Sequence, residues 1–259
     1  MLNKEDILAD LHTHTIFSGH AYSTLKENID ELCSMGSYEF IGVTDHYFDD
    51  LVPLHKKNTS ARLNYCKDRF NRFDIGIKVI NGAEFNIGHY PQELYYVSNL
   101  DWKIIGLHNW MYSLDRKSLK QVEEEILFSL SLNMIKFNGL AHIERELHKL
   151  ENGKYSLGIS SEIEKFFDNI INFCKVNEIA MEVNESSIVF NEGSSVDRLK
   201  CWVKKAKENG NYIYLGTDAH SSYEVGKFDN CIKLLNDIDY PKSLILNCDR
   251  ERLKELSDK

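Results

Sequence analysis

Seven histidines in this sequence fall at or just after the end of a short apolar run. The first run ends in Asp10-Leu11-His12-Thr13-His14, and His20 follows in the next loop. The others lie in Thr44-Asp45-His46, Leu107-His108, Ala141-His142 and Thr217-Asp218-Ala219-His220, and Gly82-Ala83-Glu84 ends a further run. Imidazole nitrogens with a few carboxylates suit Zn²⁺, Mn²⁺ or Fe²⁺, whereas Ca²⁺ and Mg²⁺ prefer oxygen ligands. The residue types therefore predict a transition-metal site.

The placement of these residues supports the same interpretation. Side chains two residues apart in an extended segment project to one side, so His12 and His14 can bind one ion. The C-terminal ends of parallel strands are also where α/β barrels and sheets assemble their active sites. A single histidine at a strand end is usually a hydrogen-bonded polar residue, but seven such placements with matching acids favour a metal site. The remaining histidines do not fit these positions and are predicted to be surface residues: His55, His89 and His148.

Apolar runs and amphipathic stretches alternate along the chain and predict the elements that position these residues. We expect strands at Ile7–Leu11, Phe40–Thr44, Lys78–Ala83, Ile104–Leu107, Phe137–Ala141, Ile179–Val183 and Tyr212–Gly216. We expect helices at Thr24–Met35, Ser60–Phe73, Leu119–Asn133, Glu162–Val176, Val196–Asn209 and Val225–Leu235. This alternation predicts parallel strands and an α/β architecture, although it does not separate a barrel from an open doubly wound sheet.

Capping residues mark several of the predicted helix ends. Ser23, with Glu27 soon after it, and Ser160 are typical of helix starts, while Gly36 and Gly210 are typical of helix ends. The chain has three prolines and no Gly/Ser/Pro-rich linker or fixed-period repeat. We therefore expect one domain over residues 1–259.

Composition narrows the class of protein. The 259 residues are 42% hydrophobic and 27% charged, which suits a soluble globular protein with a substantial core. The net charge of −9 argues against nonspecific binding to nucleic acid or an anionic membrane, but bound cations would reverse the field locally. No apolar run has the length of a signal peptide or membrane span. The six cysteines are scattered, which disfavours zinc fingers and disulfide frameworks and favours reduced thiols in a cytoplasm.

Five segments together resemble the PHP superfamily, named for polymerase and histidinol phosphatase, over nearly the whole chain. They read DLHTHT, SGHAYSTLKE, GVTDH, MEVNESS and LGTDAHSSYEVGKFDNCIKLL, and in order and spacing they are most similar to YcdX-type phosphatases. The resemblance implies a distorted (β/α)₇ barrel with three divalent metal ions (Zn, Mn or Fe) at the C-terminal ends of its strands. It also implies the ligands: His12, His14, Glu84 and Asp218 for the first ion, His20, His46 and His220 for the second, and His108 and His142 for the third, with Glu84 bridging the first and third.

Other site residues follow from their positions beside these ligands. Asp10 and Asp45 adjoin ligand positions and are expected to orient imidazoles. Asp218, Glu84 and Arg145 are the candidate catalytic residues, and Arg145, Asn109, Asn184 and Ser186 are candidate substrate contacts. Many family members have His-Pro where this chain has His142-Ile143, so we expect the loop after His142 to differ in shape.

The function expected from such a site is hydrolysis of a small phosphomonoester. Divalent ions lower the pKa of a bound water from about 15.7 toward 7 and stabilise charge on the phosphoryl oxygens. Histidinol-phosphate phosphatase is a neighbouring alternative, as is a phosphodiesterase or nuclease acting on oligonucleotide ends, which would need a basic groove with stacking aromatics. A structural metal site in an interaction module is a further alternative, but such sites are usually closed and rich in cysteine. We expect no nucleic-acid or membrane partner, and association into a homo-oligomer stays open.

Overall fold

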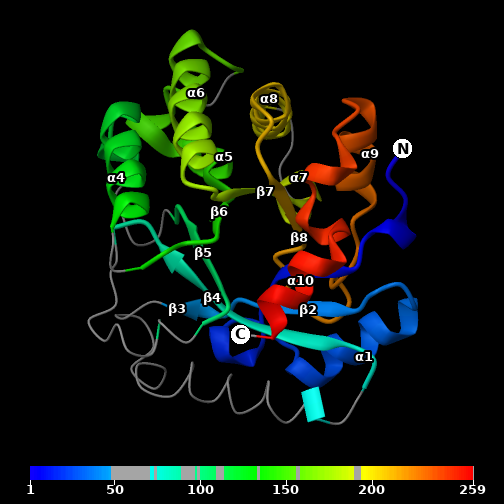
Figure 1. Ribbon diagram of the computed structural model, residues 1–259. Helices are drawn as coiled ribbons and strands as arrows, with labels where there is room; N and C mark the ends of the chain where they lie inside the picture. The colour runs from blue at the N-terminus through cyan, green and yellow to red at the C-terminus, as the bar shows by residue number, and fades with distance from the viewer. Residues whose placement is uncertain are drawn as a thin grey trace.

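Seven parallel strands form a nearly closed barrel, which confirms the predicted fold class (Figure 1). The computed structural model describes residues 1–47, 71–72, 75–88, 97, 100–108, 114–132, 135–155, 158–189 and 194–258. The strands follow in the order β1 (Ala9–Thr13), β2 (Phe40–Val43), β4 (Lys78–Asn86), β5 (Trp102–Gly106), β6 (Gly139–Ala141), β7 (Ala180–Asn184) and β8 (Ile213–Gly216). A two-residue strand, β3 (His46–Tyr47), continues the line of β2 and pairs with the second half of β4.

Helices cover the outside of the strands. They are α1 (Leu25–Met35), α4 (Leu119–Ser131), α5 (Ile143–Glu146), α6 (Ser161–Val176), α7 (Glu185–Val189), α8 (Ser194–Asn209), α9 (Asp229–Asp237) and α10 (Arg250–Ser257). Figure 1 shows α4, α6, α8 and α9 in an arc around the later strands, with α1 on the opposite side beside β2. None of the helices within the described ranges has both the length and the apolar character needed to span a lipid bilayer.

Helix α6 illustrates why these segments pack against the barrel. Six of its apolar side chains recur at helical spacing and are buried: Ile163, Phe166, Phe167, Ile170, Ile171 and Cys174. Residues three and four apart lie on one face of a helix, so this stripe faces the strands while the charged positions face water. A second apolar cluster fills the inside of the barrel, where Trp102 and Tyr214 meet edge to face with ring centroids 5.1 Å apart.

The barrel closes between β1 and β8 through a few specific hydrogen bonds. Near the C-terminal ends of the strands, the Asp218 N–H donates to the His12 carbonyl over 2.8 Å, and the His14 N–H donates to the Ala219 carbonyl over 2.9 Å. These bonds join backbone groups of four residues in the two metal-ligand segments. The bonds that close the barrel therefore also hold the two segments side by side.

Farther from the site, a buried side chain from a later segment joins β1 to β8. Asn247 is fully buried, and its Nδ2 donates to the carbonyls of Ala9 and Leu215, each over 2.9 Å. Its Oδ1 accepts the Leu215 N–H over 2.7 Å. One amide group thus satisfies three backbone groups that a continuous strand ladder would otherwise pair.

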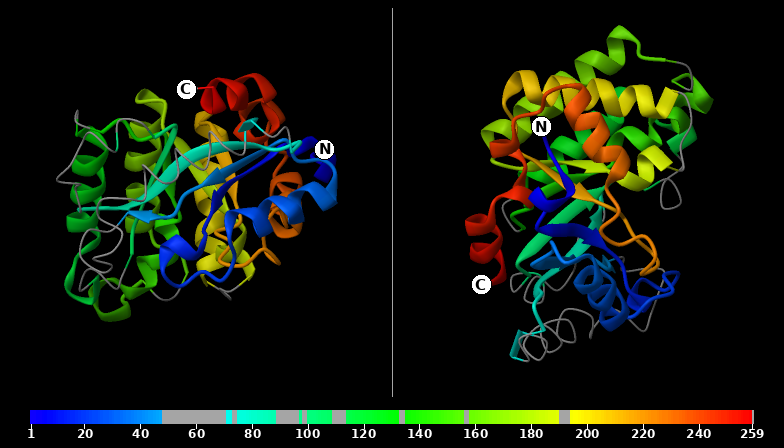
Figure 2. Two further views of the ribbon diagram at one scale, coloured as in Figure 1. Left: turned by 90° about the horizontal axis from the view of Figure 1, so that it is seen from below. Right: turned by 90° about the vertical axis from the view of Figure 1, so that its right-hand side faces the viewer.

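Helix α10 covers the end of the barrel that lies away from the metal-ligand segments (Figure 2). Its Leu253 is fully buried in the interior cluster. Ion pairs join this region to the starts of two strands: Arg250 contacts Glu39, and Lys78 contacts Asp258 over 3.1 Å. The barrel is closed by apolar packing at this end, so its polar opening lies at the opposite end.

The predicted elements agree with the structure in type and differ at their ends. All seven strands are present, but β4 extends to Asn86 and β1 is shifted to Ala9–Thr13. The predicted helix at Val225–Leu235 begins at Asp229, because Gly226 has a φ of +73° that a helix cannot include. The predicted helix at Ser60–Phe73 lies outside the described residues except for 71–72, which are helical. Helices α5, α7 and α10 were not predicted.

Of the predicted caps, one was assigned to the wrong residue. The capping residue of α1 is Thr24, which lies three residues before Glu27, as a reciprocal capping box requires; Ser23 is one residue too early. Ser160 accepts the Ile163 N–H and caps α6 as predicted. Gly36 has a φ of +78° at the end of α1, where a side chain would be strained.

Candidate metal centre

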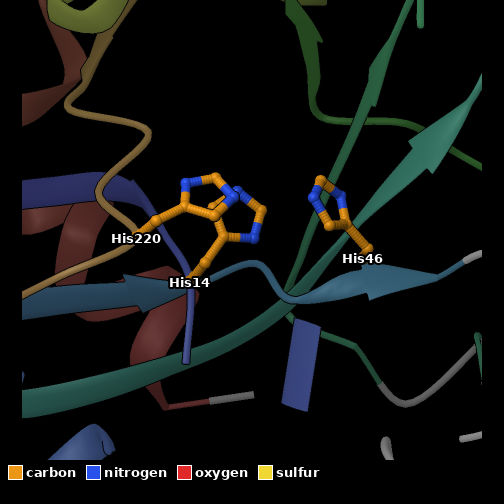
Figure 3. Close-up of side chains that lie close together, drawn as sticks. All are labelled: His14, His46 and His220. Carbon is orange, nitrogen blue, oxygen red and sulfur yellow. The ribbon is translucent and has the colours of Figure 1, made fainter. Parts of the chain in front are cut away.

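All nine predicted metal ligands lie together at the C-terminal ends of the strands. They come from β1 and the loop after it (His12, His14, His20), β3 (His46), β4 (Glu84), and the segments after β5 (His108), β6 (His142) and β8 (Asp218, His220). Figure 3 shows His14, His46 and His220 approaching one another from three separate elements. The histidine at residue 148 is half-buried and bonds to its own helical turn, while those at 55 and 89 lie outside the described residues.

One group of four ligand atoms has the spacing of a metal site. Nε2 of His14 lies 3.1 Å from Nε2 of His12 and 3.1 Å from Oδ1 of Asp218. Nε2 of His12 lies 3.5 Å from the same Asp218 oxygen. Oε2 of Glu84 lies 3.6 Å from Nε2 of His12 and 3.7 Å from Nε2 of His14. A tetrahedral ion with ligands at about 2.0–2.2 Å separates its ligands by about 3.3–3.6 Å, so these residues fit a divalent cation.

The two oxygens of Glu84 face different groups of histidines. Oε1 lies 3.1 Å from Nε2 of His108 and 2.9 Å from Nε2 of His142. Oε2 lies 2.8 Å from Nδ1 of His46. A fully buried carboxylate between several imidazoles is suited to bridge two cations.

A third group of histidines lies toward the barrel opening. Nε2 of His20 is 2.8 Å from Nε2 of His220, and the rings of His20 and His46 stack with centroids 5.0 Å apart. One ligand atom each from His14, His46 and His220 lies within 4.8 Å of the others. His14 therefore belongs to both groups and joins them.

The electrostatics of the cluster keep His14, His46 and Glu84 in the forms that bind metals. Burial lowers the pKa of His14 well below its usual value and that of His46 to about 4, so both imidazoles are neutral. Burial alone would raise the pKa of Glu84, but the imidazoles of His108 and His12 outweigh it and hold the carboxylate ionised. Burial opposes protonation of His12, but its carboxylate neighbours, Glu182 first, raise its pKa well above the usual value. A cation bound at Nε2 of His12 would take the place of this proton, and the same carboxylates would stabilise the cation.

Glu182 orients ligands on two sides of the cluster. Its Oε1 lies 2.6 Å from Nδ1 of His12, and its Oε2 accepts the backbone N–H of His142 over 3.0 Å. A carboxylate at Nδ1 fixes that proton and leaves Nε2 of His12 free to face a metal. His142 has a φ of +24°, which is uncommon for a residue with a side chain, and the Glu182 bond helps to hold it there.

The contacts of Asp10 correct its expected role, whereas those of Asp45 agree with a role in orienting an imidazole. Asp10 accepts backbone N–H groups of His12, Thr217 and Gly226 and the Thr217 hydroxyl, so it holds the segment after β8 and contacts no imidazole. Asp45 acts through Ser18, whose Oγ donates to Asp45 over 2.6 Å and lies 2.9 Å from Nδ1 of His14.

Among the predicted substrate contacts that the structure describes, Arg145 contacts two candidate metal ligands directly. Its Nη1 donates to Oδ2 of Asp218 over 2.9 Å, and its Nη2 lies 3.4 Å from Nε2 of His142. The segment after His142 forms the short helix α5, and this turn carries Arg145 back over the cluster. Asn184 is fully buried at the end of β7, Ser186 is half-buried in α7, and Asn109 lies outside the described residues.

Sequence reasoning did not identify Glu182, Ser18 or Asn86 as supporting residues. Asn86 accepts from the His108 backbone N–H and lies 3.2 Å from its Nδ1. Asn86 lies in β4, two residues after Glu84. Glu182 lies in β7, beside the strand that precedes His142. An inward-facing polar residue in an apolar strand was the available signal.

A nearly closed parallel barrel with a buried histidine and carboxylate cluster at its C-terminal end defines a barrel metalloprotein. The sequence matches the PHP domain family over residues 10–186, more than half of the chain, and the protein belongs to that family. A probable phosphatase from Acetivibrio thermocellus is 30% identical over 260 residues, which cover 96% of this chain and 94% of the relative. The probable phosphatase YcdX of Shigella dysenteriae serotype 1 is 26% identical over 250 residues, covering 94% of this chain and 91% of that protein.

A solved structure supports the fold independently. The histidinol phosphate phosphatase (HISK) from Lactococcus lactis subsp. lactis Il1403, complexed with zinc, L-histidinol and phosphate, is similar with a TM-score of 0.61 at 20% sequence identity. The similarity covers 90% of this chain and 94% of the other. It extends over nearly the whole barrel.

Proposed function

We propose that this metal-dependent phosphoesterase hydrolyses small phosphomonoesters at a cluster of three divalent ions. The observation that carries the proposal is the group of His12, His14, Glu84 and Asp218, whose ligand atoms are 3.1–3.7 Å apart in the measured pairs. The names of the relatives, which are probable phosphatases, support the reaction class.

The proposed ligand sets are those expected from the sequence. They are His12, His14, Glu84 and Asp218 for the first ion, His20, His46 and His220 for the second, and His108, His142 and Glu84 for the third. Zn²⁺, Mn²⁺ and Fe²⁺ suit this nitrogen-rich set. When bound, such ions supply Lewis-acid stabilisation of phosphoryl charge and lower the pKa of water. Three divalent cations less two carboxylates leave a formal charge of about +4, which would attract a phosphate to an otherwise acidic protein.

The proposed catalytic residues are Arg145, Asp218 and Glu84, of which the last two are also proposed ligands. The Arg145 guanidinium, although partly buried, stays charged because Asp218 raises its pKa further above the usual value. Its planar N–H groups suit phosphate oxygens, so we propose that it positions the substrate. Burial would raise the pKa of Asp218, but His12 and the hydrogen bond from His14 outweigh it and hold the carboxylate ionised. An ionised Asp218 suits ligation better than proton donation to a leaving group.

Histidinol phosphate is the first specific substrate to test, because the similar solved structure is a histidinol phosphate phosphatase bound to L-histidinol and phosphate. Phosphodiester hydrolysis is the competing reaction. We further propose one domain for the whole chain. A cytoplasmic location and a homo-oligomer stay predictions; the described cysteines, Cys33, Cys174, Cys201, Cys231 and Cys248, are all free thiols.

The experiment compares chelator-treated protein with the same protein reloaded with Zn²⁺ or Mn²⁺. Metal content is measured by elemental analysis, and hydrolysis is measured with p-nitrophenyl phosphate, bis-p-nitrophenyl phosphate and histidinol phosphate. We expect activity on the monoester only after reloading, and none for His12→Ala. Undiminished activity after verified removal of all metal would refute the proposal, and faster hydrolysis of the diester would replace the substrate class.

A further inference from the structure

Asn184 presents a fixed and unsatisfied hydrogen-bond donor to the metal cluster. It ends β7 and is fully buried. Its Oδ1 accepts the backbone N–H of Ser187 over 2.7 Å, at the start of α7. A backbone N–H can only donate, so the atom facing Ser187 must be the amide oxygen. The opposite atom, Nδ2, is therefore an NH₂ group of known orientation.

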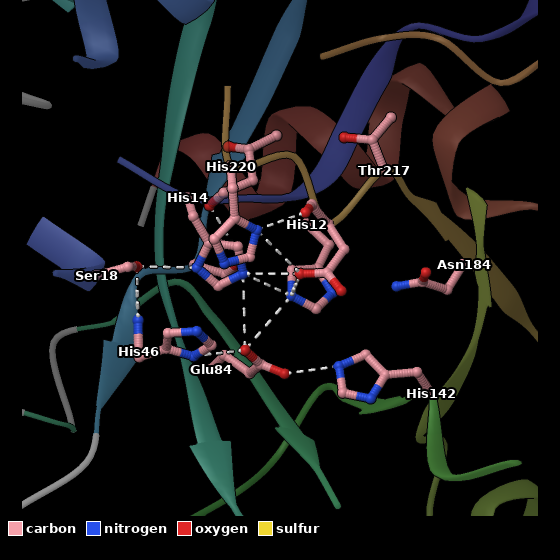
Figure 4. Close-up of polar contacts among 12 residues, drawn as sticks. His12, His14, Ser18, His46, Glu84, His142, Asn184, Thr217 and His220 are labelled. Atoms are coloured by element: carbon pink, nitrogen blue, oxygen red, sulfur yellow. Dashed lines mark hydrogen bonds and ion pairs between the residues drawn. The ribbon is translucent and has the colours of Figure 1, made fainter. Parts of the chain in front are cut away.

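This NH₂ group has no partner among the residues that the structure describes. Figure 4 shows it turned toward the side of the cluster where His12 and His142 lie. Buried donors in folded proteins are almost always paired, and an exception at a site points to a bound group. The missing partner must be an acceptor.

The chemistry of the surroundings identifies the acceptor. Arg145 lies over the same ligands, with Nη1 2.9 Å from Asp218 and Nη2 3.4 Å from Nε2 of His142. A guanidinium, a neutral amide donor and the proposed cations together form a site for an oxyanion. Because Asn184 carries no charge, it adds hydrogen-bond direction without adding another ion pair.

We infer that Nδ2 of Asn184 donates a hydrogen bond to a phosphoryl oxygen of the substrate and of the phosphate product. The inference rests on the proposed phosphoesterase function and adds a substrate-binding residue to it. Ser187 holds the amide in place through its backbone, so the donor is oriented before the substrate binds. A donor that is already oriented loses less conformational entropy when the substrate binds, which favours binding.

Two substitutions separate this role from the capping of α7. Asn184→Ser retains a hydroxyl oxygen that can cap Ser187, but it lacks the NH₂ donor. Asn184→Asp retains the capping oxygen and the shape, but it replaces the donor with a charged acceptor. Ser187→Ala is the matched control, because it keeps the backbone N–H that orients Asn184 and changes only a neighbouring buried hydroxyl.

The experiment measures binding of inorganic phosphate to metal-loaded proteins by calorimetry, with metal content and melting temperature determined for each variant. A hydrogen bond to a charged group predicts a phosphate Kd raised about 10- to 100-fold in Asn184→Ser. The Kd rises further in Asn184→Asp, and it is unchanged in Ser187→Ala. Phosphate binding as tight as in the parent for Asn184→Ser would overturn the inference, as would loss of metal from both Asn184 variants. A parent protein that neither binds phosphate nor hydrolyses phosphomonoesters would refute the proposed function itself.

Discussion

Replacing Glu182 with glutamine tests how far the metal centre depends on a residue that is not itself a ligand. The two oxygens of Glu182 face two donors, Nδ1–H of His12 at 2.6 Å and the backbone N–H of His142 at 3.0 Å. Glutamine has one acceptor oxygen and one NH₂ group. In either orientation, its NH₂ group faces one of these two donors. The substitution conserves shape and necessarily loses one of the two bonds.

The magnitude follows from the loss of one buried bond. A buried donor left unsatisfied costs about 1–3 kcal/mol. Substitution of a residue that supports a metal ligand typically weakens metal affinity about 10- to 100-fold, which equals about 1.4–2.8 kcal/mol. The two routes agree, so we expect Glu182→Gln to raise the metal Kd by one to two orders of magnitude.

The assay is competition with a metal chelator of known affinity, read as Zn²⁺ retained by each protein. Glu185→Gln is the matched control. Like Glu182, Glu185 uses both carboxylate oxygens as acceptors: Oε1 accepts from the Asn230 N–H and side-chain amide, and Oε2 accepts from the Cys231 N–H. These donors belong to the start of α9 and not to the metal ligands. The control should therefore melt at a lower temperature, by about 2–4 °C per kcal/mol lost, with unchanged metal affinity.

Equal metal affinity in Glu182→Gln and the parent would refute the reasoning, because it would mean that His12 and His142 hold their positions without the carboxylate. A similar loss of affinity in both variants would also refute it, since the effect would then be general destabilisation.

Three further predictions concern the fold around the site. In Gly216→Ala, the added Cβ would collide with Oε1 of Glu182, so we expect weaker metal binding in the same chelator assay. Gly36→Ala is the control: its Cβ would meet no atom within 4 Å, so the free energy of unfolding should fall by only about 1–2 kcal/mol through backbone strain. Asn247→Leu removes the amide that joins β1 to β8, and urea denaturation should show a loss of about 2–4 kcal/mol, whereas an unchanged midpoint would contradict its closing role. Burial raises the pKa of Glu144 from 4.5 to about 7, so its stability contribution is full below pH 4.5 and is lost as pH rises through 7. Glu144→Gln should therefore be stabilising relative to the parent at pH 8 and nearly neutral at pH 4, and the opposite trend would exclude this assignment.

The strands and the clustering of the candidate ligands could be predicted because both depend on local patterns. Apolar runs of four to six residues define buried parallel strands whatever their partners, and a histidine that ends such a run must lie at the C-terminal rim. His12 and His14 share a side because of the two-residue period of a strand. The strand boundaries were less certain, since the polar ligands themselves lie inside β1 and β4 and interrupt the apolar pattern.

The supporting residues could not be predicted from local patterns. Glu182 is 170 residues from His12 in the sequence, and Asn247 is 238 residues from the Ala9 carbonyl that it bonds. Their side chains are polar residues in otherwise apolar or loop segments, which the sequence does not distinguish from solvated ones. Asp10 was predicted to orient an imidazole because it adjoins His12 along β1 two residues away, but its carboxylate accepts from backbone groups and the Thr217 hydroxyl instead.

By itself, the sequence indicated the chemistry of this protein, because seven imidazoles and two carboxylates at strand ends are the residue types that transition-metal cations prefer. The tertiary structure decided which atoms face one another. It placed both oxygens of Glu84 between separate histidine groups, set Glu182 against two ligands and left the amide of Asn184 facing the cluster. Residue type sets what a side chain can bind, whereas distances of 3 Å between segments far apart in the chain arise only when the barrel closes.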